Sequence, residues 1–421
     1  MSYVTASTQR RTRTRWWVRL LQVLLVVVLV VPVPYVGAAI LAPTPVFAAE
    51  EVAPPVTPGA EAQIDWPTTP VAAGFSVVGL EGATGTSGST QSHPTASVGK
   101  LITVLVVLDA HPLEGADRGP TITYDAVDVA LQDAAFAENA PIAPVRTGAT
   151  TTQRDLIEYA LVDSAANAAT SLARWAFGDQ DAYVAAANAW LAREGLVGTT
   201  VADAAGLDAA TVSTAADLVA IGERIVANPV TLGAVQLPSV TIPGIGAAPN
   251  TNRILGQHDI DGGKTGTLVV WGRNLFVTAE RVVDGVPRRV VIVIMGTIQA
   301  TVTDEAAIAL LESVYANIQQ RELLPAGAVV GTYEAPWGSS VEATTTEAVV
   351  GTTWGTAVPA IDVELEALPT EAHRAEVGTM TVALADGEVV VPVEPSGRIA
   401  APELSWRLTH PLVVLDWLTG S

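Results

Sequence analysis

Residues 95–108 read TASVGKLITVLVVL, and the rest of the chain is best understood from this stretch. Lys100 is its only charged residue, and Ser97 stands three residues earlier. Lys100 and Lys264 are the only lysines of the chain, and all of its remaining strongly basic residues are arginines. A buried lysine can lose its proton near neutral pH, whereas a guanidinium stays charged. The pattern predicts that Lys100 is a base and Ser97 its nucleophile.

The spacing of Ser97 and Lys100 fits this chemistry. Residues 97–109 are apolar on almost every side, which predicts a helix that is buried all round. Side chains three residues apart share a helix face, so the amine and the hydroxyl can meet. A serine hydroxyl becomes a good nucleophile only when a base takes its proton. The alternative is a helix N-cap serine followed by a lysine that reaches solvent.

The second lysine has a different setting. Lys264, Thr265, Gly266 and Thr267 open a stretch rich in β-branched residues, which predicts a strand. A lysine and a threonine can together hold a carboxylate by charge and hydrogen bonding. A glycine in a strand permits another backbone to come close. The alternative is a solvated turn lysine.

Composition excludes several classes of protein. The chain has 421 residues, a net charge of −21 and no cysteine. Its acidity predicts that it does not bind nucleic acid, because it would repel phosphates. A thiolate nucleophile and Cys-ligated metal are excluded. No metal site is expected, since no two histidines stand four residues apart, and no cofactor is expected. The five histidines are His93, His111, His258, His373 and His410.

The N-terminal segment predicts export. Five arginines precede an uncharged apolar stretch at 20–42, and residues 46–48 (VFA) have the small-residue spacing of a cleavage site. Residues 1–49 are therefore predicted to be a signal peptide or an N-terminal membrane anchor. The body of the protein would then lie outside the cytoplasm, secreted or anchored on the cell-wall side of the membrane. Residues 50–70, rich in Pro, Ala, Thr and Glu, read as a linker.

The remaining pattern predicts an α+β fold with two domains. Residues 71–322 would form a sheet flanked by helices, with a mainly helical insert. Residues 325–400 alternate as in strands and predict a small β-domain. The apolar tail at 401–421 is either a membrane-interface anchor or a segment docked on the β-domain. The expected strands are 73–80, 265–270, 274–279 and 289–295, and the expected helices beyond 97–109 are 152–161, 165–177, 181–194, 214–228 and 304–320.

The order of three motifs resembles the penicillin-recognising serine enzymes. Ser-x-x-Lys at 97–100 is followed by Ser164 and then by Lys-Thr-Gly at 264–266. More narrowly, the chain resembles the low-molecular-weight penicillin-binding proteins that are serine-type D-alanyl-D-alanine carboxypeptidases. Residues 206–208 (GLD) and 213–215 (STA) are similar to segments of that family. The resemblance covers about residues 70–400 and implies a transpeptidase/β-lactamase-like domain with an appended C-terminal β-domain.

That resemblance also implies roles for single residues. Ser97 would attack the carbonyl between the two terminal D-alanines of a peptidoglycan stem peptide, and Lys100 would accept its proton. Ser164 would relay that proton to the leaving amine. The backbone N–H groups of Ser97 and Thr267 would form an oxyanion hole. β-Lactams would be covalent inhibitors. The implied substrate-binding residues are Lys264, Thr265, Gly266 and Thr267.

The middle motif departs from the family pattern. The family carries Ser-x-Asn, but here Ala166 stands two residues after Ser164, and Asn167 comes one position late. One residue on a helix corresponds to a rotation of about 100°. Either Asn167 reaches the substrate through a shifted backbone or the asparagine role is lost. One alternative is therefore a catalytically impaired wall-binding or scaffold homologue. The other is a β-lactamase, which is less favoured because no Glu-x-x-Leu-Asn segment stands between residues 164 and 264.

Overall fold

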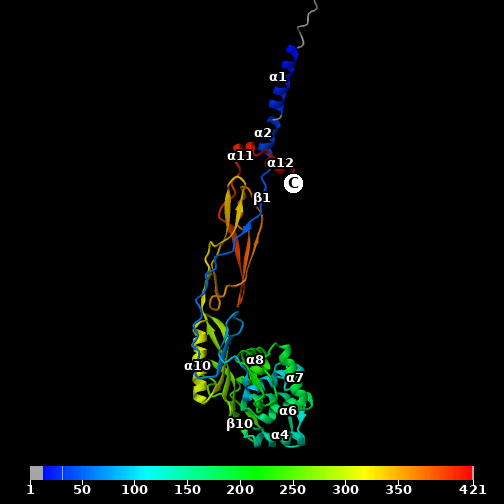
Figure 1. Ribbon diagram of the computed structural model, residues 1–421, viewed down its shortest axis with the longest axis vertical. Coiled ribbons are helices and arrows are strands. Elements are labelled where there is room, and N and C mark those ends of the chain that lie inside the picture. Colours follow the sequence, from blue (N-terminus) through cyan, green and yellow to red (C-terminus); the bar gives the residue numbers. More distant parts are fainter. Residues whose placement is uncertain (1–12, 31, 420–421) are drawn as a thin grey trace, which may run out of the picture. The chain divides into compact units, whose positions relative to one another are not determined.

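The computed structural model describes residues 13–30 and 32–419 (Figure 1). These residues form two compact units. The larger unit comprises residues 58–321 and 352–358. The second unit comprises the described residues up to 57, residues 322–351, and those from 359 onward. The arginines at 10 and 11, which belong to the predicted export segment, lie outside the described residues.

An antiparallel sheet of five strands is the centre of the larger unit. Its strand order is β11-β12-β13-β3-β4. The strand predicted at 265–270 begins earlier and ends at Leu268, because Trp271 N–H bonds back to the Leu268 carbonyl and closes a hairpin turn. The strands are β3 (Ala72–Val77), β4 (Thr84–Gly88), β11 (Ile260–Leu268), β12 (Gly272–Val283) and β13 (Val286–Thr297).

Helices cover both faces of this sheet (Figure 1). On one face, α10 (Ala300–Ala316) packs Leu310 and Val314 against strand residues such as Ile292. The predicted helix at 304–320 is this element, displaced toward the N-terminus because a strand, β14 (Gln320–Leu324), begins where it was expected to end. On the other face, the helical insert packs against Phe276 and Val291 among others. The predicted α+β class is confirmed.

The insert contains the expected helices and two that were not expected. Its central helix is buried along nearly its whole length, as the apolar pattern at 97–109 predicts. The elements are η1 (Ala96–Gly99), α3 (Lys100–Ala110), α4 (Ala126–Ala137), α5 (Gln153–Glu158), η2 (Tyr159–Asp163), α6 (Ala166–Phe177), α7 (Gln180–Arg193), α8 (Ala215–Ala227) and α9 (Pro229–Gln236), with short strands β5 (His93–Pro94), β6 (Thr121–Thr123), β7 (Thr150–Thr152), β8 (Val212–Ser213), β9 (Ser239–Ile242) and β10 (Gly246–Pro249).

The helix predicted at 152–161 changes type before it ends. Thr152 and Asp155 form the predicted capping box, each side chain accepting from the other's backbone N–H. After Glu158 the chain widens into η2, a single π-helical turn. Such turns are frequent at functional sites. This one ends at Ser164, whose φ of 67° is left-handed.

A sheet of six strands forms the core of the second unit. Its order is β18-β20-β21-β16-β15-β2, and its buried side includes Tyr333, Met380 and Val393. A second pairing joins β1 antiparallel to β19. The strands are β1 (Val46–Phe47), β2 (Glu50–Glu51), β15 (Val329–Glu334), β16 (Ser340–Thr345), β17 (Val349–Thr352), β18 (Ile361–Leu365), β19 (Leu368–Pro369), β20 (Gly378–Leu384) and β21 (Gly387–Pro395).

The N-terminal and C-terminal segments of the second unit each form helices. The apolar N-terminal stretch forms α1 (Arg13–Val30) and α2 (Pro32–Leu41), and the tail forms α11 (Leu404–Thr409) and α12 (Pro411–Thr419). Within the described residues, one helical stretch, Trp16–Leu41, is long and apolar enough to cross a membrane. The bent pair α8–α9 meets the same length and composition test, although much of it lies in the core of the larger unit.

Candidate active site

Ser97 and Lys100 face each other where η1 passes into α3. Lys100 Nζ lies 2.7 Å from Ser97 Oγ and donates a second hydrogen bond of 2.7 Å to the Ala205 carbonyl. The Lys100 side chain is fully buried, whereas Ser97 keeps some exposure. The lysine therefore does not reach solvent, and the geometry of a nucleophile next to a base is present.

Burial sets the protonation of Lys100. Removal of the ammonium from water lowers the pKa of Lys100 from 10.5 to about 7, and the nearby Asp203 carboxylate opposes this shift. A pKa near neutrality gives a substantial population of free amine at pH 7. Lys100 can thus accept a proton from Ser97 under ordinary conditions.

Asp203 also holds the loop that carries the Ala205 carbonyl. Its carboxylate accepts hydrogen bonds from the N–H groups of Ala205 (3.2 Å) and Leu207 (2.8 Å). The hydroxyl of Thr211 donates to the same carboxylate at 2.6 Å. Sequence reasoning missed Asp203. An aspartate that accepts from N–H groups two and four residues on is a common turn feature, so nothing in the sequence distinguished it.

Lys264 and Ser164 form the second pair. Lys264 Nζ donates to Ser164 Oγ at 2.9 Å and to the Thr265 carbonyl at 2.8 Å. Lys264 is fully buried, and burial lowers its pKa well below 10.5. The charge of Lys100 lowers the pKa of Lys264 further, while Asp163 raises it. The two lysines are therefore electrostatic neighbours, and Ser164 lies at one of them.

Gly266 brings β11 against η1. A Cβ atom on Gly266 would lie 2.9 Å from the backbone N of Ser97, the backbone O of Thr95 and the backbone N of Val98. Real Cβ atoms essentially never come this close to backbone, so only glycine fits without a shift. This close approach places the strand that carries Lys264 beside the Ser97 backbone.

The other residues of the Lys-Thr-Gly-Thr stretch lie at the surface of β11. Thr265 Oγ1 donates to Thr251 Oγ1 at 2.7 Å, which fixes the Thr265 hydroxyl. Thr251 in turn is held by its N–H bond to the Val162 carbonyl at 3.1 Å. Thr267 is exposed. The structure thus groups Ser97, Lys100, Ser164 and the 264–267 stretch around one region of the larger unit.

The structure does not bring the Asn167 side chain into this group. Its Oδ1 accepts from the Ala143 N–H at 2.9 Å, and its Nδ2 donates to the Ala143 carbonyl at 2.7 Å. The amide is therefore engaged with a backbone segment outside the motifs. Ala166 packs its methyl group with Ala135 and Ala205. The rotation of about 100° between adjacent helix positions is consistent with this different direction of the Asn167 side chain.

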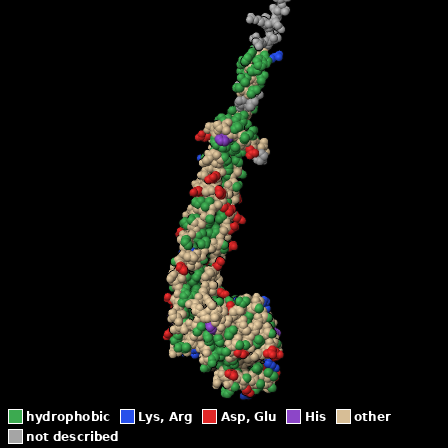
Figure 2. Space-filling model, viewed as in Figure 1, with side chains coloured by type: hydrophobic (Ala, Val, Ile, Leu, Met, Phe, Trp, Pro, Cys, Tyr) green, Lys and Arg blue, Asp and Glu red, His purple; other side chains and the backbone are tan. Residues whose placement is uncertain are grey.

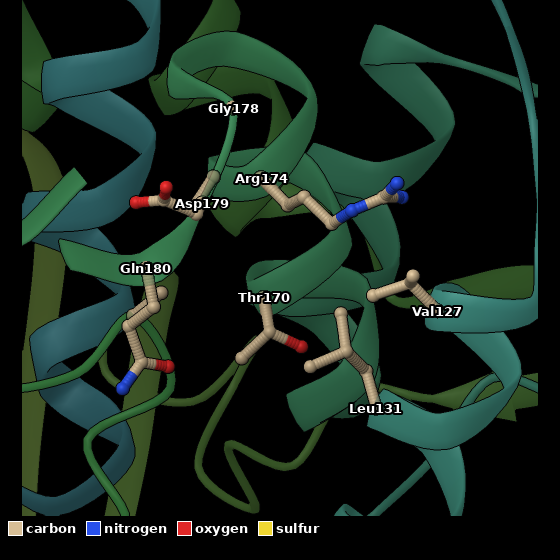
Figure 3. A pocket seen from close by; sticks show the side chains of 9 residues that line it. Val127, Leu131, Thr170, Arg174, Gly178, Asp179 and Gln180 are labelled. Atoms are coloured by element: carbon tan, nitrogen blue, oxygen red, sulfur yellow. The ribbon is translucent and has the colours of Figure 1, made fainter. Parts of the chain in front are cut away.

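A separate cavity of about 390 Å³ opens beside α4, α6 and the start of α7 (Figure 3). Its lining mixes aliphatic side chains with Thr170 and Gln180, and its Arg174 guanidinium is already ion-paired with Asp125 at 2.6 Å. None of the motif residues lines this cavity. Its lining residues are Val127, Leu131, Thr170, Ala173, Arg174, Gly178, Asp179, Gln180 and Ala204.

The sequence matches known proteins, and the match to a family profile lies within this same unit. The profile of the D-alanyl-D-alanine carboxypeptidase family matches residues 83–299. The D-alanyl-D-alanine carboxypeptidase DacB2 of Mycobacterium tuberculosis is 32% identical over 182 residues, covering 42% of this chain and 58% of the relative. The D-alanyl-D-alanine carboxypeptidase DacD of Salmonella typhimurium is 30% identical over 255 residues, covering 59% and 63%. The matched segments thus span about three fifths of each relative.

A solved structure agrees with the fold. Penicillin binding protein 6B from Escherichia coli aligns over 79% of this chain and 99% of its own, with 22% identity and a TM-score of 0.56. This likeness confirms the expected penicillin-binding-protein fold. The family profile covers more than half of the chain, within which Ser97, Lys100, Ser164 and Lys264 lie. The chain therefore belongs to the D-alanyl-D-alanine carboxypeptidase family.

Proposed function

We propose that the protein is a serine-type D-alanyl-D-alanine carboxypeptidase. It would remove the terminal D-alanine from peptidoglycan stem peptides through an acyl-enzyme on Ser97. The observation that carries the proposal is the 2.7 Å contact between Ser97 Oγ and a fully buried Lys100 whose pKa is lowered to about 7. Membership of the family supports the same reaction.

In the acylation step, Ser97 Oγ attacks the carbonyl carbon between the two D-alanines while its proton passes to the Lys100 amine. The N–H groups of Ser97 and Thr267 would stabilise the oxyanion, a contribution of about 3–4 kcal/mol per donor in other enzymes. The C–N bond then breaks. Lys100 then gives that proton, relayed through Ser164, to the leaving amine and returns to its neutral form; the Ser164 hydroxyl lies 2.9 Å from Lys264 Nζ.

In the deacylation step, water attacks the ester on Ser97, and Lys100 accepts the proton of that water. The ester C–O bond breaks, and Lys100 returns the proton to Ser97 Oγ. The shortened stem peptide leaves with a new carboxylate. The same amine serves as base in both steps. The rates of acylation and deacylation therefore both depend on its ability to change between protonated and neutral forms near pH 7.

Lys264 would bind the terminal carboxylate of the substrate together with Thr265. Without substrate, burial and Lys100 hold the pKa of Lys264 low. An anion placed next to a buried amine favours its ammonium form. The arriving carboxylate would therefore raise the pKa of Lys264 and strengthen its own binding. Gly266 would serve here by allowing β11 to lie close to the Ser97 backbone.

The location and partners follow from the same chemistry. Stem peptides lie outside the cytoplasm, so the larger unit would work on the cell-wall side of the membrane. β-Lactams would acylate Ser97 as inhibitors, and nucleic acid is not a partner. The division into residues 71–322, 325–400 and 401–421, with an export segment at 1–49 and a linker at 50–70, stays a prediction.

Covalent labelling tests the proposal. A tagged penicillin should add its mass to Ser97 of the wild type and not to a folded Ser97→Ala variant. Ser239→Ala, which removes an exposed serine from β9, is the matched control and should label like the wild type. Release of D-alanine from a peptide ending in D-Ala-D-Ala establishes the carboxypeptidase. Fast penicillin hydrolysis would indicate a β-lactamase instead, and no adduct on folded wild type would indicate a non-catalytic wall-binding protein.

A further inference from the structure

The C-terminal helices pack on the end of the N-terminal apolar segment. Val414 of α12 is fully buried, and it shares a small core with Ala39 and Ala42 at the end of α2. Tyr35 and Trp417 are partly buried against the same core. In the described chain this is the only core cluster that includes a residue of α12. The only buried residue of α12 therefore packs on α2, while the ring of Trp417 also lies 5.7 Å from that of Trp337.

Specific polar contacts join the same elements. Arg407 Nη1 donates to the carbonyls of Ala39 and Ala42, each at 3.0 Å. These are carbonyls at the end of α2, where a cation is favoured by the helix dipole. Tyr35 Oη donates to the Arg407 carbonyl at 2.6 Å. These bonds link residues more than 360 positions apart in sequence.

The first strand after α2 is also part of the second unit. Val46 and Phe47, within the possible cleavage site, pair with Pro369 and Leu368. The ring of Phe47 lies 5.3 Å from that of Trp337, edge to face. Cleavage after Ala48 would remove these residues together with α2. Val414 would then lose its core partners, and Arg407 would lose both carbonyls.

The rest of the surface of α2 is apolar, and that of α12 is apolar apart from the exposed Asp416 and Thr419. The side chains of Leu412, Leu41 and Ile40 are 81%, 80% and 56% exposed, and Leu415 and Leu418 add to the same elements. Figure 2 shows hydrophobic side chains along α1 and α2 without intervening acidic ones. Such an accumulation of exposed apolar side chains marks a membrane or protein contact.

The bilayer is the partner that fits this surface. The helical stretch Trp16–Leu41 has 26 residues, and about 20 residues cross a hydrocarbon core. About six residues at one end would therefore extend into the headgroup region, and these belong to α2. The arginines before Trp16 orient the N-terminus toward the cytoplasm, which puts α2 at the outer surface.

Aromatic residues and charge favour the same location for α11 and α12. Trp406 and Trp417 stack at 5.9 Å, and tryptophan is enriched at membrane interfaces. Neither α2 nor α12 contains lysine or arginine, α12 carries the acidic Asp416, and Arg407 of α11 is bonded to carbonyls at the end of α2. Attraction to anionic lipid therefore does not drive the contact, and insertion of leucine side chains does.

We infer that the N-terminal helix is retained in the mature protein as a membrane anchor, and that α11 and α12 dock on its outer end and insert into the bilayer interface. Residues 404–419, which form these two C-terminal helices, are called the collar. The collar lies at the outer end of the anchor. This inference concerns attachment and does not rest on the proposed activity. The tail is then both docked and interfacial, with α2 as its partner.

The first test is the N-terminus of the exported protein. The full chain is expressed in a bacterium, recovered from its membranes and analysed by intact mass and N-terminal peptide mapping. The expected result is a chain that still contains α1 and α2. A mature chain that begins at Ala49 would overturn the inference.

The second test uses the absence of cysteine from the sequence, which gives a clean background. In membranes, the pair Ala39→Cys and Val414→Cys, whose side chains share one core, should form a disulfide on mild oxidation, detected as a linked peptide by mass spectrometry. The pair Ala39→Cys and Leu412→Cys is the control, because Leu412 points to the surface with 81% exposure. Equal linking of both pairs, or of neither in a chain that retains α2, contradicts the docking.

The third test locates the collar relative to lipid. An environment-sensitive fluorophore on Leu415→Cys of the full chain, reconstituted in phosphatidylethanolamine/phosphatidylglycerol vesicles, should be quenched several-fold more by brominated lipid than the same label on Val390→Cys. Val390 is an exposed apolar residue of β21 with 59% exposure, against 48% for Leu415. Quenching should persist in 1 M salt. Equal quenching at both positions, or its loss in salt, would contradict insertion.

Discussion

The burial of Lys100 lowers the free energy of unfolding by an amount that depends on pH. Lys100 has a pKa of about 7 in the folded chain, against the ordinary lysine value of 10.5. The unfolded chain therefore binds more protons between these values, and stability rises with pH across that window. Below about pH 7, the free-energy cost of burying the charged Lys100 amine is fully present. A residue that weakens the fold at neutral pH is typical of a functional site.

The first prediction concerns the base. The rate of penicillin acylation should rise with pH and level off above about pH 7, because only the neutral Lys100 amine accepts the Ser97 proton. Lys100→Arg should reduce the rate by about 10²–10⁴-fold, the usual contribution of a general base. Stopped-flow labelling across pH measures both. A wild-type rate that does not change between pH 5 and 9 would show that another group is the base.

The second prediction concerns Asp203. Because the Asp203 carboxylate raises the pKa of Lys100, Asp203→Asn should move the midpoint of the acylation profile to lower pH. Asp208→Asn, in the same loop, is the matched control, since the Asp208 carboxylate is bonded to the Ala210 N–H and should leave the midpoint in place. A fall in rate at every pH with no movement of the midpoint would mean that Asp203 acts only on loop structure.

The third prediction separates structure from catalysis at Asn167. Asn167→Ala should destabilise the larger unit, by about 1–3 kcal/mol for each buried Ala143 backbone group left unpaired. The acylation rate of the folded fraction should stay within a few-fold of wild type. Thermal unfolding and labelling of the same sample measure the two effects. Lost acylation with unchanged stability would instead place Asn167 in the substrate site.

At the scale of elements, the site depends on the contact of β11 with η1. Gly266→Ala should lower acylation about 10²-fold, because a Cβ 2.9 Å from the Ser97 backbone N forces strand and helix apart, and displacements of about 1 Å have costs of this size. Gly233→Ala in α9 is the control. It meets no atom within 4 Å and should stabilise its helix by about 1 kcal/mol with full labelling. Normal labelling of Gly266→Ala would show that the contact is not required.

At the scale of the whole molecule, the larger unit includes a short segment, residues 352–358, that is separated in sequence from residues 58–321. Trp354, within residues 352–358, is buried against Phe75 with ring centroids 5.5 Å apart. Trp354→Ala should therefore destabilise the larger unit by about 3–5 kcal/mol. Trp337→Ala, in the second unit, is the matched control and should leave penicillin labelling after mild heating unchanged. Equal heat sensitivity of labelling in both variants would contradict this assignment.

The sequence by itself determined the motif residues and the main elements. The apolar stretch at 97–109 requires burial on all sides, and the Thr152 capping box is a local hydrogen-bond pattern, so both are readable from residue order. The two lysines were informative because arginine replaces lysine everywhere else. The order of the three motifs was sufficient to indicate the family that the profile match established.

The tertiary structure alone decided features that join distant residues. Asp203 reaches Lys100 through a loop about a hundred positions away, and Asn167 is committed to Ala143. Neither partner has a fixed spacing in sequence. The packing of α11 and α12 on α2 joins segments from opposite ends of the sequence, and Arg407 of α11 bonds to a carbonyl of α2. Such contacts depend on how the elements pack in space, and periodicity and local propensity carry no information about that packing.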